Sequence, residues 1–115
     1  MDAIEKFLLE CGYKIDRNAP TISTNLHASF YKHLDRDDAP LCELNRKLTV
    51  YINWYDNRAY GSQSQSFTMG IQAQVNDLNE EWCSLDLYGL RFSQLKSNHD
   101  QYIEKLVKSW TAINS

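Results

Sequence analysis

The segment from Phe67 to Val75 reads Phe-Thr-Met-Gly-Ile-Gln-Ala-Gln-Val. Apolar residues occupy every second position, and the positions between them hold threonine, glycine and glutamine. This two-residue period is typical of a β-strand that buries one face and exposes the other. Asn76 and Asp77, residue types that are common in turns, end the pattern. The segment therefore predicts a strand over 67–75, in a sheet that is covered on one side.

Two further segments, 48–55 and about 82–88, show the same period and predict two more strands. A shift of one residue in either strand would exchange its buried and exposed sets, so the pattern also predicts the register. The side chains expected to face the core are Leu48, Val50, Ile52, Trp54, Cys83, Leu85 and Leu87. Those expected on the opposite face are Thr49, Tyr51, Asn53, Tyr55, Trp82, Ser84, Asp86 and Tyr88.

The segment from Thr21 to Leu34 fits two periods. With a period of two, Leu26, Ala28 and Phe30 share one side, and His27 and Tyr31 are among the residues on the other. With a period of 3.6, some of the same apolar residues also align, as they would on a helix. The β-branched residues at its start and the adjacent aromatic residues favour a strand, which is the interpretation we adopt.

Helices are predicted at both ends of the chain. In the segment from Asp2 to Glu10, apolar residues recur at helical spacing, and Gly12 follows as a residue suited to the left-handed C-cap conformation. A second helix is predicted from about Asn98 to Ile113, with Ser97 as its N-cap. His99, in its first turn, is expected on the surface. The apolar stripes are Ile4, Phe7, Leu8 and Cys11, and Ile103, Leu106, Val107, Trp110 and Ile113.

The order of these elements, one helix, four strands and one helix, indicates an α+β fold. Consecutive strands with short connections pair antiparallel, so a four-stranded meander is the simplest sheet. Each strand and each helix has one apolar side, which predicts a two-layer sandwich with both helices packed on one face of the sheet. The chain contains no repeat and no long linker, and we expect 1–115 to form a single domain.

Charge and cysteine content narrow the functional classes. Fifteen acidic and twelve basic residues give a net charge of −3, and the basic residues are scattered, which disfavours binding to duplex DNA. No apolar run approaches the roughly 18 residues of a membrane helix, and the start of the chain lacks the pattern of a secretory signal. We therefore expect a cytoplasmic protein that does not bind membranes. Its three separated cysteines, Cys11, Cys42 and Cys83, are expected to be reduced.

Aromatic residues mark the candidate binding surface. Tyrosine and arginine are enriched at the centres of protein interfaces, although tyrosine also stabilises sheets through cross-strand contacts. On the open face of the predicted sheet, the candidate binding residues are Tyr31, Tyr51, Tyr55, Tyr88, His27, Gln72 and Gln74. In the segment that follows the strand over 48–55, the candidates are Arg58 and Tyr60.

The leading interpretation is a non-enzymatic module that binds one partner protein, such as a small inhibitor, immunity or adaptor protein. The alternative is a small enzyme or a ligand-binding domain that uses His27, His33 and Asp86 with the tyrosines. A weak binder of single-stranded nucleic acid is a third possibility. The chain has no nucleophile or phosphate-binding motif, and the charged turn over 35–38 lacks the spacing of a calcium loop. The sequence predicts no catalytic residue, metal or cofactor.

Overall fold

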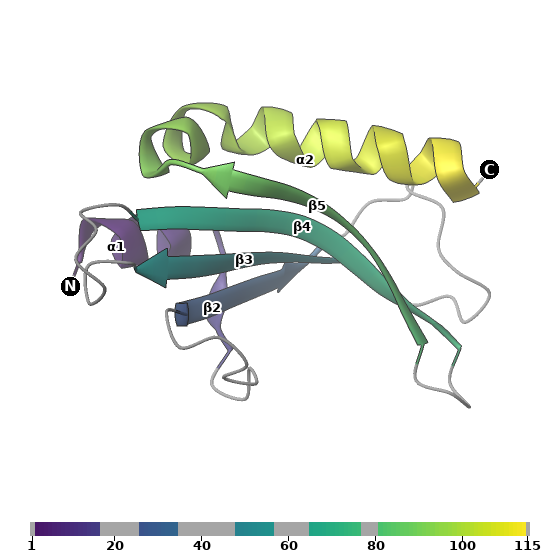
Figure 1. Cartoon of the computed structure of the whole chain (residues 1–115), viewed down its shortest axis with the longest axis horizontal. Helices are drawn as coiled ribbons and strands as arrows, with labels where there is room; N and C mark the ends of the chain where they lie inside the picture. Colours follow the sequence, from purple (N-terminus) through teal and green to yellow (C-terminus); the bar gives the residue numbers. More distant parts are fainter. Residues whose placement is uncertain (1, 17–25, 35–47, 57–64, 77–80, 115) are drawn as a thin grey trace.

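The computed structural model describes residues 2–16, 26–34, 48–56, 65–76 and 81–114, except for the side chains at 73–76, 81–83 and 113–114. Five antiparallel strands form a meander in chain order, with a helix before it and a helix after it (Figure 1). The predicted α+β fold is confirmed, with five strands instead of four. The elements are α1 (Ala3–Glu10), β1 (Lys14–Ile15), β2 (Leu26–His33), β3 (Thr49–Asp56), β4 (Gln65–Asn76), β5 (Glu81–Leu90) and α2 (Phe92–Asn114).

The unpredicted strand, β1, is only two residues long and pairs with β2 through Lys14 opposite Tyr31 and Ile15 opposite Phe30. Two residues are too few to show a period, so the sequence pattern does not reveal it. The helix before it, α1, begins and ends as predicted. The Asp2 carboxylate caps its first turn by accepting a hydrogen bond from the amide of Ile4 at 2.7 Å. Gly12 follows its last turn with a φ of 93°.

The described part of the segment 21–34 forms strand β2, as predicted, but a bulge interrupts its alternation. Leu26 pairs with Tyr55, whereas Ala28 pairs with Trp54, so β2 has one residue more than β3 at this point. Leu26 therefore shares a face with Tyr55 and not with the core, where the pattern placed it. His27, the extra residue, has its ring 4.2 Å from the ring of Trp54, so it packs on a core residue and does not join the tyrosines.

Helix α2 begins at Phe92, six residues before the predicted start, so Ser97 is not its N-cap. The side chain of Gln94 accepts a hydrogen bond from the amide of Arg91 at 2.9 Å, which is one half of a capping box. The earlier start extends the apolar stripe of the helix to Leu95, which is fully buried. His99 lies on the same stripe, four residues after Leu95, and is 6% exposed. The prediction that His99 is a surface residue is therefore wrong.

One hydrophobic core lies between the sheet and the two helices. On β3 the side chains of Val50, Ile52 and Trp54 are buried, whereas those of Tyr51 and Tyr55 are partly exposed on the other face, as the alternation predicts. None of the helices in the described part of the chain is long and apolar enough to cross a membrane. Among the residues with described side chains, the core contains Ile4, Leu8, Tyr13, Phe30, Leu48, Val50, Ile52, Trp54, Phe67, Met69, Ile71, Leu95, Ile103, Leu106, Val107 and Trp110.

Candidate binding surface on the open face of the sheet

A single row of paired residues crosses the face of the sheet that the helices leave uncovered. Lys14 pairs with Tyr31, Tyr31 with Tyr51, Tyr51 with Gly70, and Gly70 with Asp86, so each of the five strands supplies one residue. Directly paired residues lie on the same face of a sheet. A cation therefore stands at one end of this row, a carboxylate at the other, and two tyrosines between them.

The middle of this row is closely packed because Gly70 has no side chain. A Cβ atom at Gly70 would lie 2.7 Å from the hydroxyl oxygen of Tyr51 and 2.6 Å from the carbonyl oxygen of Leu85, and nearer still to Oδ1 of Asp86. The side chains of Tyr51 and Asp86 therefore occupy the space above Gly70. Such a close approach of neighbouring groups requires glycine. Asp86 Oδ1 is buried there and has no hydrogen-bond partner in the described part of the chain.

Tyr88 extends this polar cluster along the edge strand β5. It is 72% exposed, and its hydroxyl donates a hydrogen bond of 2.8 Å to Oδ2 of Asp86. This hydrogen bond and the charge of Asp86 raise the pKa of Tyr88, so the phenol keeps its proton at neutral pH and remains a donor. Tyr55 lies on the same face of β3 as Tyr51, in the row of Ser66. We refer to Tyr51, Tyr55, Asp86 and Tyr88 as the tyrosine–aspartate cluster.

The remaining predicted residues have different placements. Gln72 lies on the open face in the row of His33, Thr49 and Ser84. The backbone of Gln74 belongs to β4, but its side chain lies outside the described residues, as do Arg58 and Tyr60 altogether.

The structure does not bring the proposed enzyme residues together. His33 is on β2 and Asp86 is on β5, so two strands separate them, which corresponds to about 14 Å at the usual spacing of strands. His27 lies beside Trp54. His33 instead contacts its neighbours, with Nδ1 3.2 Å from the hydroxyl oxygen of Thr49.

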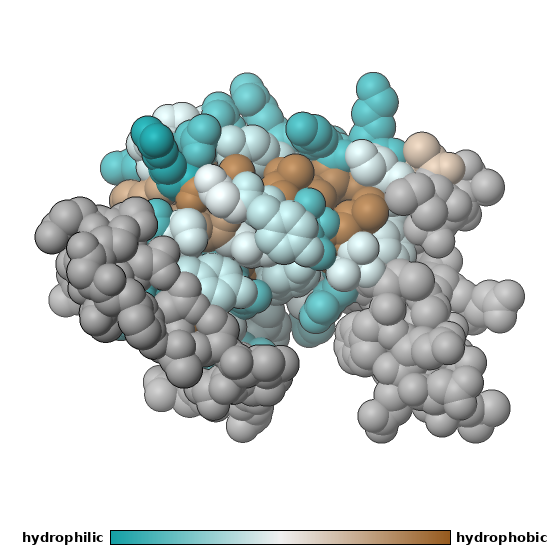
Figure 2. Space-filling view, viewed as in Figure 1, coloured by the Kyte–Doolittle hydropathy of each residue, from teal (hydrophilic) through white to brown (hydrophobic). Residues whose placement is uncertain are grey.

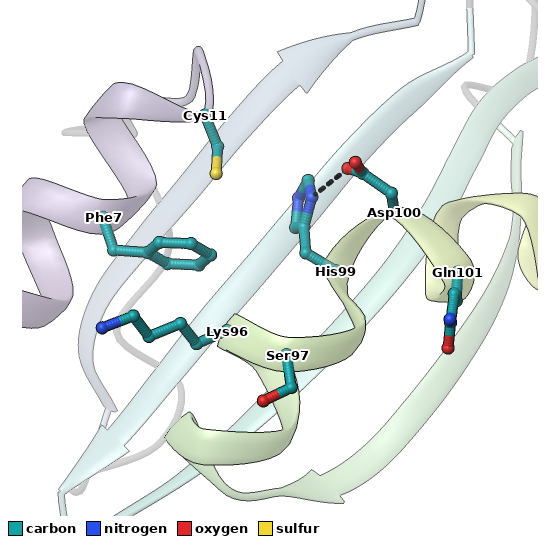
Figure 3. A pocket seen from close by; sticks show the side chains of 7 residues that line it. All are labelled: Phe7, Cys11, Lys96, Ser97, His99, Asp100 and Gln101. Atoms are coloured by element: carbon teal, nitrogen blue, oxygen red, sulfur yellow. Dashed lines mark hydrogen bonds and ion pairs between the residues drawn. The ribbon is translucent and has the colours of Figure 1, made fainter.

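A second polar site, which the sequence pattern did not reveal, lies between α1 and α2. This site is an open groove of about 350 Å³. In Figure 3, Phe7 of α1 and Cys11, which follows α1, lie on one side of the groove, with His99 and Asp100 of α2 on the other. The groove combines a thiol, an imidazole and a carboxylate, the residue types of a cysteine nucleophile with its base. Their hydrogen bonds decide whether they can act in that way.

Both ring nitrogens of His99 are occupied. Nδ1 lies 2.9 Å from Oδ1 of Asp100, and Nε2 lies 2.7 Å from the hydroxyl oxygen of Tyr13. A carboxylate only accepts, so Nδ1 donates to Asp100, and in the neutral tautomer with Nδ1 protonated Nε2 accepts from the Tyr13 hydroxyl. Burial is the main cause that raises the pKa of Tyr13 above its ordinary value, which keeps this phenol protonated as the donor. His99 therefore links Tyr13, which directly precedes β1, to α2.

Cys11 is poorly suited to nucleophilic chemistry. It caps the C-terminus of α1, the negative end of the helix dipole, where a thiolate is disfavoured. Burial raises the pKa of its thiol, and this effect is larger than the lowering caused by the positive charge of Lys32. Because His99 Nε2 is already bonded to Tyr13, this groove has the composition of a cysteine active site, but its imidazole is not free to activate the thiol. Its hydrogen bonds serve to hold α2 against the start of the chain.

We expect Tyr13→Phe to lower the free energy of unfolding by about 1–3 kcal/mol, because the substitution leaves Nε2 of buried His99 without a donor. The measurement is urea unfolding at pH 7. In the wild-type protein, the raised pKa of Tyr13 contributes stability that is fully present below the ordinary tyrosine pKa of 10.0 and is lost as the pH rises above it. Above pH 10 the stability of Tyr13→Phe should therefore fall less steeply than that of the wild type.

Tyr102→Phe is the matched control, because in the described part of the chain the Tyr102 hydroxyl accepts one long hydrogen bond of 3.4 Å from Asn98, and the residue is partly exposed. We expect this variant to stay within about 0.5 kcal/mol of the wild type. Equal stability of both variants, with parallel pH dependence, would show that the bond between Tyr13 and His99 does not hold the two ends of the chain together.

Among the described residues, no group of three or more histidine, cysteine, aspartate and glutamate side chains is arranged to hold a metal ion. Compared with known protein families, curated proteins and solved structures, the chain gives no match. Its function must therefore be argued from its own surfaces.

Proposed function

We propose that this protein is a non-enzymatic interaction module that binds one partner protein through the open face of its sheet. Small inhibitors, immunity proteins and adaptors are proteins of this kind. The observation that carries the proposal is the tyrosine–aspartate cluster on the face opposite the helices, with Tyr88 at 72% exposure.

The chemistry of this cluster suits protein recognition. Tyrosine offers a large, rigid and partly polar contact area at a low cost in side-chain entropy. Interface hot spots are enriched in tyrosine and sit where water can be excluded. On this face Tyr55 pairs with Ser66, a small polar residue, so a partner could approach the sheet closely beside this tyrosine.

Plain stabilisation of the sheet explains part of this arrangement but not Tyr88. Tyr31 and Tyr51 are direct cross-strand neighbours, and such pairs stabilise sheets by about 0.2–1 kcal/mol each. Tyr88 is different because most of its surface remains in solvent, and in the described structure it is the one large hydrophobic residue that is so exposed. A large aromatic residue that is barely packed contributes little to folding, which supports a role in binding.

The test is to immobilise the protein, capture its partner from an extract of the native host, and identify the partner by mass spectrometry. Tyr55→Ala is then expected to weaken binding of the identified partner by about 2 kcal/mol or more, roughly 30-fold, because it removes an aromatic anchor. Lys105→Ala, at an exposed position of α2, is the control and should bind normally.

The proposal fails if Tyr51→Ala and Tyr55→Ala both fold and bind the partner as the wild type does. The open aromatic face would then be structural, and the binding site would have to be sought elsewhere in the chain, beginning with 57–66.

A further inference from the structure

Strand β5 forms the long edge of the sheet. It pairs with β4 on one side, and no other described strand lies on its other side. Six consecutive residue pairs, from Trp82 opposite Gln74 to Leu87 opposite Met69, run between two irregularities of the ladder. The opposite edge of the sheet is the two-residue strand β1. One side of a regular six-residue stretch therefore keeps backbone donors and acceptors that no described strand uses.

The sequence of this edge lacks lysine and proline, two residue types that often protect an exposed strand. Natural edge strands carry lysine, proline or inward-pointing charges, which discourage another chain from pairing with them. The stretch 82–88 reads Trp-Cys-Ser-Leu-Asp-Leu-Tyr and contains no proline and no basic residue. An edge of this composition is well suited to accept a further strand.

The two faces beside this edge differ in chemistry. On the helix side, Leu85 and Leu87 are only partly buried against the core. Figure 2 shows apolar surface in a band along β5 beneath α2. On the open face, Ser84 is exposed, Asp86 holds a carboxylate oxygen without a hydrogen-bond partner in the described part of the chain, and Tyr88 projects into solvent.

We propose that β5 accepts an extended segment of the partner protein as a sixth strand, and that this segment alternates apolar and basic residues. The inference rests on the proposed function and names the chemistry of its partner. Alternate side chains of an added strand point to opposite faces. Its apolar residues would lie against Leu85 and Leu87, and its basic residues would lie beside Asp86 and the rings of the tyrosine–aspartate cluster, where a cation is attracted by both.

The same charges argue against a second copy of this chain at this edge. An antiparallel pair of β5 strands related by a twofold axis near the middle of the strand would bring the two Asp86 carboxylates onto one face, close to each other. Like charges on neighbouring strands destabilise the pairing. A basic segment of another protein has the opposite, favourable interaction, and it also complements the net charge of −3.

The experiment uses the whole protein labelled with ¹⁵N and a synthetic probe peptide of about eight residues, a common strand length, in which lysine and valine alternate. We expect the peptide to slow amide exchange along β5 on the order of tenfold. A peptide of the same composition, with its valines in one block, tests charge without alternation. The alternating peptide with methylated backbone nitrogens on one edge tests the strand hydrogen bonds. Neither control should protect β5.

Ser84 is exposed, so a negative or a positive charge can be placed on the open face of β5 without disturbing the core. This tests whether the peptide is attracted by negative charge. Ser84→Glu should bind the alternating peptide several-fold more tightly, and Ser84→Lys several-fold more weakly, with both variants as stable as the wild type. Asp86→Asn should also weaken binding.

Equal protection by the block peptide, or by the methylated peptide, would overturn the inference, because binding would then be only electrostatic. Protection of β5 that grows with protein concentration in the absence of peptide would overturn it in favour of a second copy. The proposed function is tested separately. If Tyr55→Ala loses the natural partner but Ser84→Lys keeps it, the open face binds the partner and the edge does not.

Discussion

Trp54→Ala is expected to lower the free energy of unfolding by about 3–5 kcal/mol, a large share of the stability of a domain of this size. Trp54 is 3% exposed, and its ring stacks at 6.0 Å on the ring of Phe67 from the neighbouring strand. Its indole N–H has no hydrogen-bond partner in the described part of the chain, so the substitution loses packing and not a hydrogen bond. The cost therefore has two parts: the favourable free energy of burying the ring is lost, and a cavity remains in the core.

Tyr55→Ala is the matched comparison, because the two residues are adjacent on β3 but point to opposite faces. It should cost about 1 kcal/mol, since it loses cross-strand contacts and leaves the core intact. Urea unfolding followed by circular dichroism measures both variants. If Tyr55→Ala unfolds the protein and Trp54→Ala does not, the buried and exposed faces of β3 are exchanged, with Tyr55 in the core and Trp54 outside it.

Trp110→Ala is expected to have an effect of similar size, about 3–5 kcal/mol. Trp110 is 2% exposed and is among the largest fully buried side chains of the core. It lies near the C-terminal end of α2, on the same stripe as Ile103, Leu106 and Val107. Its loss removes much of the apolar contact that holds this half of the helix on the sheet, because tertiary packing of an amphipathic face provides most of the stability of such a helix.

Ser109→Ala provides the control for this substitution, because Ser109 is exposed on the same turn of α2. It should change stability by less than about 0.5 kcal/mol. Both variants are measured by urea unfolding with circular dichroism, because tryptophan fluorescence is itself altered in Trp110→Ala. A loss of less than about 1 kcal/mol in Trp110→Ala would show that the end of α2 contributes little to the core.

Both of these predictions depend on patterns that are visible in the chain before folding. The alternation over 48–55 distinguishes Trp54 from Tyr55, and the apolar stripe of the last helix includes Trp110. Such local periods are reliable because one buried face forces the same spacing on every residue of an element. The α+β class and the one-sided sheet follow from them, and both are confirmed by the structure.

The features that these patterns missed are short or irregular. Strand β1 has two residues, and the bulge at His27 inserts one residue into β2, which moves Leu26 to the face of Tyr55. The earlier start of α2 was signalled by Leu95, which stands four residues before His99, as His99 stands four before Ile103. The spacing placed His99 on the buried stripe, but its polar side chain made a surface position the simpler expectation.

Other features depend on which strands become neighbours, and a local period carries no such information. The row from Lys14 to Asp86 exists because the meander brings five strands into one register, and Gly70 is needed because Tyr51 and Asp86 meet above it. The hydrogen bond between Tyr13 and His99 joins residues 86 positions apart in the chain. Periodicity reports which side of an element is buried, whereas the partners of a buried polar group are set by packing between distant segments, which the chain acquires only on folding.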